Sequence, residues 1–494
     1  MQIKKLWACI LVTIFIVGLV INVTPVASSS AEWTFMAERG VKAYPDLTEY
    51  VWQKNASAPP HGPYDKIGLH RLVKTGIEPL GVLFICPGTW SSGEQLLSNP
   101  PEDLWTKYEN YTQSIYWANR GFDVYSIDYR THFVPIDLSL SELSFMADWG
   151  WDQWISDIKE AVDKAKEVSG AKRIYMAGSS FGGIAAMNYA SLYWEEDLKG
   201  LIMLDPGAVG LLDGVGAKNP NPTNTYNLPA AIAEMNAAET WGSELSGPGV
   251  TFVYKYADAY PNAPSPDPAF DNITEYLTYA IYYAWGPAGV SNLYGDYGKP
   301  SVIIHTLATL DRYWPTRLGL ETTAYSDWAN CPDVTHDFDE HYSEIDVPLL
   351  AFQSEHFGFL NYGAFQHGIA NPDLTAIILW GYGHLDVYSG EYSEGDVSAP
   401  TYEWLISHRM LLGCGGVRIG GDWTCGKTTI FINATVIDFK VDGARVAWEI
   451  TYYRSDKYLE IYKGENELDS ISILITKRVS IASGPNVFFL GCRV

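Results

Sequence analysis

Residues Ile174–Ile184 read Ile-Tyr-Met-Ala-Gly-Ser-Ser-Phe-Gly-Gly-Ile. The apolar beginning predicts a buried strand, and the good helix formers from Gly183 to Tyr193 predict a helix. Between them lies the pattern Gly-x-Ser-x-Gly centred on Ser180, whose two glycines let the backbone bend sharply without a Cβ clash. This context predicts that the Ser180 hydroxyl stands at a strand-to-helix corner, where a helix N-terminus favours negative charge. We interpret Ser180 as a nucleophile; the alternative is a chance glycine-serine loop.

Strands and helices alternate on both sides of this unit. Gly81–Cys86 is a continuous apolar run, which is typical of a strand buried on both faces, and Phe122–Tyr129 is the next strand. Trp149–Ser169 has the apolar spacing of an amphipathic helix, and Leu201–Leu204 is another buried strand. The alternation predicts an α/β fold with a mostly parallel sheet and helices on both faces.

The alternation stops between residues 208 and 344. This stretch holds Pro-rich loops and two aromatic-rich segments that we expect to be helical, Tyr276–Trp285 and Thr306–Trp314. An insertion of this length between two strands predicts a helical cap over the active-site edge. The sheet is expected to resume at Val347–Gln353 and to close at Thr375–Trp380. The core would therefore comprise residues 30–207 and 345–412, with the cap insertion at 208–344.

The two ends of the chain differ from the rest. Lys4 and Lys5 precede an apolar stretch and then small residues, so residues 1–29 are expected to be a signal peptide, with an uncleaved membrane anchor as the alternative. We therefore expect a secreted or cell-surface protein. Residues 413–494 contain short alternating strands separated by turn residues, which predict a small all-β domain. Contact with a surface or a glycan is one role for such an appendage.

Composition and charge exclude several classes of protein. Hydrophobic residues make up 47% of the chain and charged residues 18%, which excludes a disordered protein. The formal net charge of −25 leaves no basic stripe to neutralise phosphates, so we expect no nucleic-acid partner. The run His336–His341 looks like a metal cluster, but its spacing matches no ligand pattern. We expect neither a metal nor an organic cofactor.

The order of these parts resembles the α/β-hydrolase superfamily over roughly residues 65 to 412. The most specific pieces are the Gly178–Gly182 turn and the pair Gly383-His384. The resemblance implies a serine nucleophile, an acid and a histidine base, in that chain order. It makes His384, on the loop after the last parallel strand, the base that takes the Ser180 proton. His132 and His356 are the next choices.

Two carboxylates compete for the third position. Glu355 follows the penultimate strand, the commonest place for the acid in this superfamily, although most relatives carry Asp there. Asp205 follows the preceding strand within Leu-Asp-Pro, where pancreatic-type lipases keep their acid in a similar sequence. We take Glu355 as the first choice and Asp205 as the alternative, ahead of Asp373. Asp386 is too near His384 in the loop to be preferred.

Acyl transfer also needs donors for a developing oxyanion. The backbone N–H of Phe181, the residue after the nucleophile, is expected to be one donor. The other should come from the loop after the first buried strand, at Thr89 or Trp90. Pro87 stands where many relatives have His, so both residues stay open.

The resemblance implies a serine hydrolase that forms an acyl-enzyme on Ser180. Because the expected cap is aromatic, a small-molecule or lipid-like carboxylic ester is the first expected substrate. Peptides and thioesters are alternatives for the same residues, since cap side chains decide among them. A hypothesis from another class is a non-catalytic binding or adhesion protein on a hydrolase scaffold.

Overall fold

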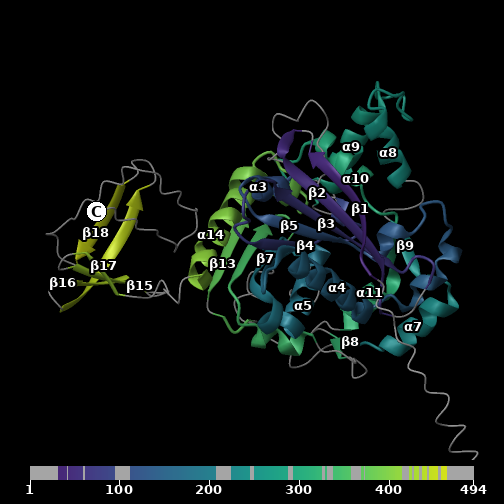
Figure 1. Cartoon of the computed structure of the whole chain (residues 1–494). Coiled ribbons are helices and arrows are strands. Elements are labelled where there is room, and N and C mark those ends of the chain that lie inside the picture. Colours follow the sequence, from purple (N-terminus) through teal and green to yellow (C-terminus); the bar gives the residue numbers. More distant parts are fainter. Residues whose placement is uncertain are drawn as a thin grey trace, which may run out of the picture.

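The computed structural model of this chain describes residues 32–41, 43–58, 62–94, 112–206, 224–244, 250–286, 293–324, 329–330, 338–357, 369–371, 373–413, 422–425, 428–432, 437–441, 444–453 and 458–463. A nine-stranded sheet with the strand order β1-β2-β3-β5-β4-β6-β7-β12-β13 forms its centre (Figure 1). These strands are β1 (Thr34–Val41), β2 (Tyr44–Asn55), β3 (Lys66–Lys74), β4 (Val82–Cys86), β5 (Asp123–Asp128), β6 (Ile174–Ser179), β7 (Leu198–Leu204), β12 (Leu349–Ser354) and β13 (Leu374–Leu379).

The sheet is mostly parallel, as predicted. Every neighbouring pair from β5 through β4, β6, β7 and β12 to β13 is parallel. Only the side formed by β1, β2, β3 and β5 is antiparallel. Every residue of β5 and β12 is buried, because helices cover both faces and leave no face for polar side chains.

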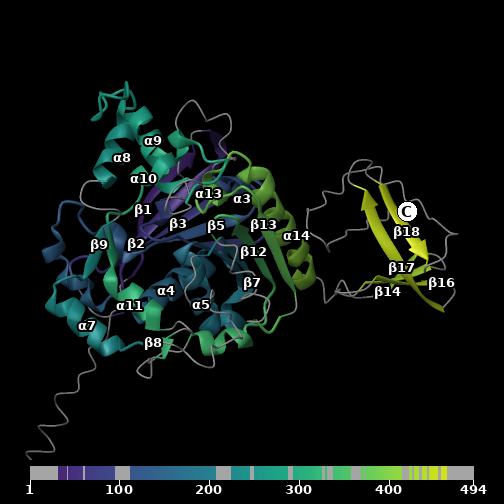
Figure 2. The same cartoon turned by 180° about the vertical axis from the view of Figure 1, so that it is seen from behind.

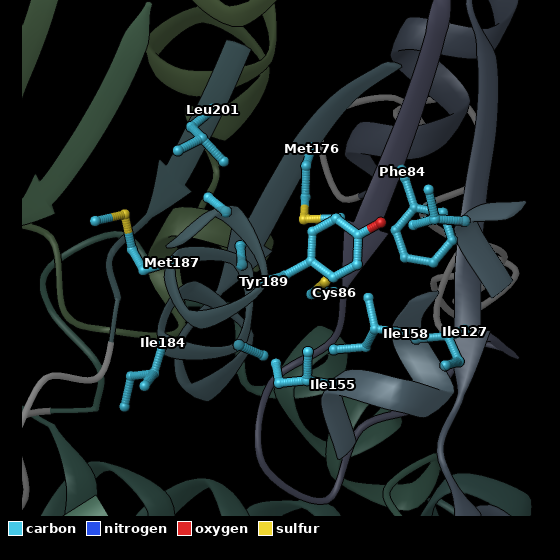
Figure 3. Close-up of a cluster of buried hydrophobic side chains, with 14 of the residues drawn as sticks. Phe84, Cys86, Ile127, Ile155, Ile158, Met176, Ile184, Met187, Tyr189 and Leu201 are labelled. Carbon is cyan, nitrogen blue, oxygen red and sulfur yellow. The ribbon is translucent and has the colours of Figure 1, made fainter. Parts of the chain in front are cut away.

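Helices cover both faces of this sheet, and each face has its own core (Figures 1 and 2). On one face, Phe84 of β4 and Met176 of β6 pack with residues of α4 (Trp151–Ser169) and α5 (Phe181–Asp197), as Figure 3 shows. On the other face, their neighbours Leu83 and Tyr175 pack with α3 (Gln113–Asn119) and α14 (Ala399–Gly413). Successive strand residues thus point to opposite cores.

We call residues 208–344, between β7 and β12, the inserted segment. Its helices are α7 (Leu228–Ala237), α8 (Val250–Ala259), α9 (Ile273–Trp285), α10 (Pro300–Ala308) and α11 (Thr316–Ala324). Its short strands are β8 (Asn224–Thr225), β9 (Gly242–Glu244), β10 (Tyr313–Pro315) and β11 (Ala329–Asn330). Helices α8, α9 and α10 share a core that includes Tyr254, Leu277 and Ile304.

One of the two helices expected in the inserted segment differs from the prediction. The segment Tyr276–Trp285 lies in α9, as expected. The segment Thr306–Trp314 is only partly helical, because α10 ends at Ala308. Tyr313–Pro315 instead pairs with Gly242–Glu244 as an antiparallel ladder, so tertiary pairing overrides local helical preference there.

Towards the C-terminus, five strands form an antiparallel sheet in sequence order. They are β14 (Asp422–Cys425), β15 (Thr428–Ile432), β16 (Ile437–Val441), β17 (Ala444–Tyr453) and β18 (Tyr458–Lys463). The expected signal peptide, and the part of the expected all-β domain that follows residue 463, lie outside the described residues. None of the described helices has the length and apolar character needed to cross a membrane.

Candidate active site

Ser180 sits at a strained corner between β6 and α5. Its φ of 54° and ψ of −122° are rare for a residue with a side chain, and such strain is typical of functional turns. The corner is so tight that a Cβ on Gly178 would lie 2.3 Å from the Gly182 carbonyl oxygen. A Cβ on Gly182 would lie 2.0 Å from the carbonyl oxygen of Cys86 in β4. Both glycines of the motif are therefore required by the backbone itself.

His384 joins Ser180 to Asp205. Its Nε2 lies 2.7 Å from Ser180 Oγ, and its Nδ1 lies 2.7 Å from Asp205 Oδ2. The three side chains come from the carboxyl ends of β6, β13 and β7, which meet at one edge of the parallel sheet. His384 is 4% exposed and Asp205 is fully buried at 0%. Of these three residues, Ser180 is the one that is partly exposed to solvent.

The surroundings of Asp205 decide which nitrogen of His384 carries the proton. Ser354 donates its backbone N–H to Asp205 Oδ1 at 2.8 Å and its hydroxyl to Oδ2 at 2.7 Å. A carboxylate oxygen can only accept, so His384 Nδ1 must be the N–H donor. Nε2 is then the acceptor facing Ser180, which is the arrangement a general base needs.

The first choice of acid, Glu355, is wrong on this geometry. Its Oε2 accepts the backbone N–H of Gly381 at 2.7 Å, at the turn after β13. Successive residues at a strand end point to opposite sides, and here it is Ser354 that points towards Asp205. The alternative acid, Asp205, occupies the position on the imidazole.

The remaining candidates lie elsewhere. Asp373 accepts from His408 Nε2 at 3.1 Å. His132 pairs with Asp311 at 3.2 Å, and the His356 backbone N–H donates to the Tyr382 carbonyl at 3.1 Å. Within the described ranges, neither of these two histidines hydrogen-bonds Ser180.

The expected oxyanion donors belong to the start of α5 and to the loop after β4. Phe181 is the first residue of α5, so its N–H has no acceptor within the helix. The loop after β4 passes beside the serine, because a Cβ on Gly88 would lie 3.1 Å from Ser180 Cβ. Thr89 and Trp90 follow on this loop, and Trp90 has a φ of 59°, which is unusual for a bulky residue. Which of the two amides faces the oxyanion stays a prediction.

Aromatic side chains pack on Phe181, the residue after the nucleophile, and on His384. Phe181 stacks on Trp151 with ring centroids 4.9 Å apart and meets Trp314 edge-on at 5.0 Å. Phe357 lies against the His384 ring at 4.0 Å. Trp314 comes from β10 of the inserted segment, and nothing in the sequence indicated that it would contact Phe181, the residue after the nucleophile.

Two polar residues that support the site were not predicted to do so. Ser354 holds Asp205, as described above. Asp386 Oδ2 accepts the N–H of Gly383, on the histidine loop, at 2.9 Å and that of Gly295, in the inserted segment, at 2.6 Å. Burial raises the pKa of Asp386 to about 6 despite these bonds. The carboxylate bonded to the His384 imidazole is Asp205 and not Asp386, which agrees with the expectation that Asp386 is too near His384 in the loop.

Within the described residues, no group of three or more His, Cys, Asp or Glu could hold a metal ion. The run His336–His341 begins outside those residues, and its last member, His341, pairs with Glu344 at 3.1 Å.

Comparisons with known proteins identify relatives of this chain. Residues 82–385 match the family model described as the alpha/beta hydrolase family. A crystal structure from Sulfolobus solfataricus, provisionally named a lipase, is 38% identical with a TM-score of 0.60, covering 76% of this chain and 99% of that one.

Two other solved structures are more distant. A carboxylesterase from Bacillus subtilis is 14% identical with a TM-score of 0.35, covering 78% of this chain and 93% of that one. A monoacylglycerol lipase from Paleococcus ferrophilus is 14% identical with a TM-score of 0.38, covering 69% of this chain and 99% of that one. No curated protein matches the chain in a sequence search.

Proposed function

The chain belongs to the alpha/beta hydrolase family, and from this premise we propose that it is a serine hydrolase of carboxylic esters. The family and the Sulfolobus solfataricus relative support a hydrolase of ester-like substrates. The single observation that carries the serine mechanism is the imidazole of His384, placed 2.7 Å from both Ser180 Oγ and Asp205 Oδ2.

The acylation half-reaction follows from these contacts. Ser180 Oγ attacks the ester carbonyl while His384 Nε2 accepts the hydroxyl proton. Asp205 keeps the Nδ1 proton in place and stabilises the imidazolium that forms. The N–H of Phe181 and one amide of the Thr89-Trp90 pair donate to the oxyanion. His384 then returns its proton to the leaving alkoxide as the ester C–O bond breaks.

Deacylation uses the same groups in reverse. Water gives a proton to His384 and attacks the acyl carbonyl, and Ser180 leaves with that proton as the carboxylic acid departs. Metal and organic cofactors have no part in this proposal.

The aromatic surroundings favour an apolar acyl group. Phe357 is 41% exposed and lies 4.0 Å from the His384 ring, centroid to centroid, and Trp90 is partly exposed on the loop that passes Ser180. Such aromatic surface binds alkyl chains by burying their area. We therefore propose a lipid-like or other apolar ester as substrate, handled by a secreted or cell-surface enzyme. A peptidase or thioesterase on the same residues remains the second candidate.

A fluorophosphonate probe tests the proposal directly. The folded wild-type protein should be labelled on Ser180, as mass spectrometry of the modified peptide would show, and Ser180→Ala should not. Rates on p-nitrophenyl esters of increasing acyl length, compared with aminoacyl amides and thioesters, would then fix the substrate class. A folded wild type that is neither labelled nor active would refute the mechanism and favour the binding-protein hypothesis.

A further inference from the structure

We propose that Asp311 is a positioning residue for the oxyanion hole, through which the inserted segment holds the loop Pro87–Gly93 in its reactive shape. We call these residues the oxyanion loop. The proposal rests on the serine-hydrolase function proposed above, and it concerns a residue that touches neither Ser180 nor His384.

The oxyanion loop has a conformation that needs support. Trp90 has a φ of 59°, and a bulky residue keeps such a backbone only where its surroundings hold it. The Ser91 N–H closes a turn onto the Gly88 carbonyl at 3.1 Å. Rotation at Trp90 would therefore redirect its own N–H, which is one of the two candidate donors.

Asp311 holds the carbonyl side of Trp90. Its backbone N–H donates to the Trp90 carbonyl oxygen at 2.6 Å. Three residues later, the Trp314 ring lies 6.3 Å from the Trp90 ring, centroid to centroid. The inserted segment thus fixes both the carbonyl and the side chain of Trp90, which together set its backbone rotation.

The side chain of Asp311 is itself anchored in the hydrolase core. Thr131 donates its hydroxyl to Asp311 Oδ2 at 3.0 Å, and His132 Nδ1 lies 3.2 Å from Oδ1. Burial alone would lower the pKa of His132, but Asp128 and Asp311 raise it to about 9. The imidazole is therefore protonated at neutral pH and forms a charged hydrogen bond with Asp311.

Core residues hold the two ends of the same loop. The Tyr129 hydroxyl donates to the Pro87 carbonyl at 3.3 Å. At the other end lies a buried pair, His70 and Asp128, whose side chains meet at 2.9 Å. A Cβ on Gly93 would lie 2.7 Å from the His70 ring and 3.0 Å from Asp128 Oδ1, so the loop lies directly on this pair. Asp311 supplies the anchor in the middle, next to the candidate donors.

The test separates positioning from binding. We would measure kcat and KM for p-nitrophenyl butyrate, and the affinity for an alkyl trifluoromethyl ketone, whose adduct with serine carries an oxyanion. Asp311→Ala should lower kcat by about 10–100-fold and lower the affinity for the ketone by a similar factor. KM should change by less than about threefold, since the substrate carbonyl is neutral in the ground state.

Three further variants make the result specific. Thr131→Val removes one support of the Asp311 side chain and should show the same pattern with a smaller effect. Asp311→Asn should recover part of the loss, because its amide oxygen still accepts from Thr131. Asp258→Ala is the matched control: this aspartate of α8 also pairs with a histidine, His305, at 2.9 Å, and its loss should leave both readouts unchanged.

Several results would overturn the proposal. Unchanged kcat and ketone affinity in a folded Asp311→Ala would do so, as would a raised KM with unchanged kcat, because the segment would then act in substrate binding. If Asp311→Ala does not fold, Thr131→Val decides the matter by the same readouts. Failure of the serine mechanism itself is distinguishable, since wild type would then resist the fluorophosphonate.

Discussion

Replacing Asp205 by Asn should abolish most of the activity by moving one proton. The carboxylate accepts the Ser354 N–H on one oxygen, and both the Ser354 hydroxyl and His384 Nδ1 on the other. An amide must place its NH2 group at one of these two positions. If the NH2 group faced the Ser354 N–H, two buried donors would point at each other, which would cost about 1–3 kcal/mol of folding free energy.

The other orientation is therefore preferred, because the Ser354 hydroxyl can rotate to accept. The amide NH2 then donates to His384 Nδ1, and the imidazole proton moves to Nε2, where it faces Ser180 Oγ as a donor. The base needed for attack is lost although every side chain stays in place. A wrong tautomer of this kind lowers kcat by about 10⁴-fold, or roughly 5.4 kcal/mol in the barrier.

The assay compares Asp205→Asn with Glu355→Gln, the neighbouring carboxylate that follows β12. Among the described residues, Glu355 accepts the Gly381 N–H, which a glutamine oxygen also accepts, so the kcat of Glu355→Gln should stay within about threefold of wild type. Steady-state rates on a short p-nitrophenyl ester, with circular dichroism as the folding control, are sufficient. A folded Asp205→Asn within tenfold of wild type, or a larger loss in Glu355→Gln, would refute the assignment.

Three further predictions concern stability, measured by urea unfolding across a pH series. Burial alone would lower the pKa of His70, but the carboxylates of Asp128 and Glu49 raise it to about 10. The protonated imidazole therefore stabilises the fold fully below the unfolded pKa near 6.5, and this stabilisation is lost as pH rises through 10. His70→Gln should be less stable at pH 7 and lose the wild-type fall of up to about 1.4 kcal/mol per pH unit; an unchanged slope would contradict this. Because burial raises the pKa of Asp386 to about 6, its charged form is penalised above pH 6 and the penalty vanishes below the unfolded pKa of 3.8. Asp386→Asn should therefore gain up to about 3 kcal/mol at pH 8 and progressively less below pH 6, whereas a pH-independent difference would argue against it. Gly182→Ala should lose about 3 kcal/mol or more, because its Cβ would lie 2.0 Å from the carbonyl at the end of β4, while Gly395→Ala, with nothing within 4 Å, should be tolerated.

The nucleophile corner could be predicted from sequence because its requirements are local. The bend at Ser180 needs small residues two positions before and after, and the sequence places glycine at both. The buried strands could also be predicted from the sequence, since continuous apolar runs are typical of a sheet covered on both faces. His384 depended on the resemblance, because a histidine after the last strand carries no signal of its own.

The acid could not be chosen from sequence because two strand ends lie between the nucleophile and the histidine. The sheet order β6-β7-β12-β13 places both Asp205, after β7, and Glu355, after β12, between Ser180 and His384. The choice depends on which residue at the end of β12 points inward. The register that pairs Phe352 with Leu204 brings Ser354 onto Asp205, and such a pairing is a property of the assembled sheet.

The inserted segment was expected to be a cap over the site, but its contacts make it part of the catalytic framework at two places. Gly295 shares the Asp386 carboxylate with Gly383 of the histidine loop, and Asp311 holds Trp90 beside the nucleophile. These anchors lie on the base side and on the oxyanion side of Ser180, respectively. A segment that only covered the site could be displaced without disturbing the geometry beneath it. Here, displacement would break the hydrogen bonds to Asp386 and to the Trp90 carbonyl, so the position of the inserted segment is physically coupled to the backbone of the histidine loop and of the oxyanion loop.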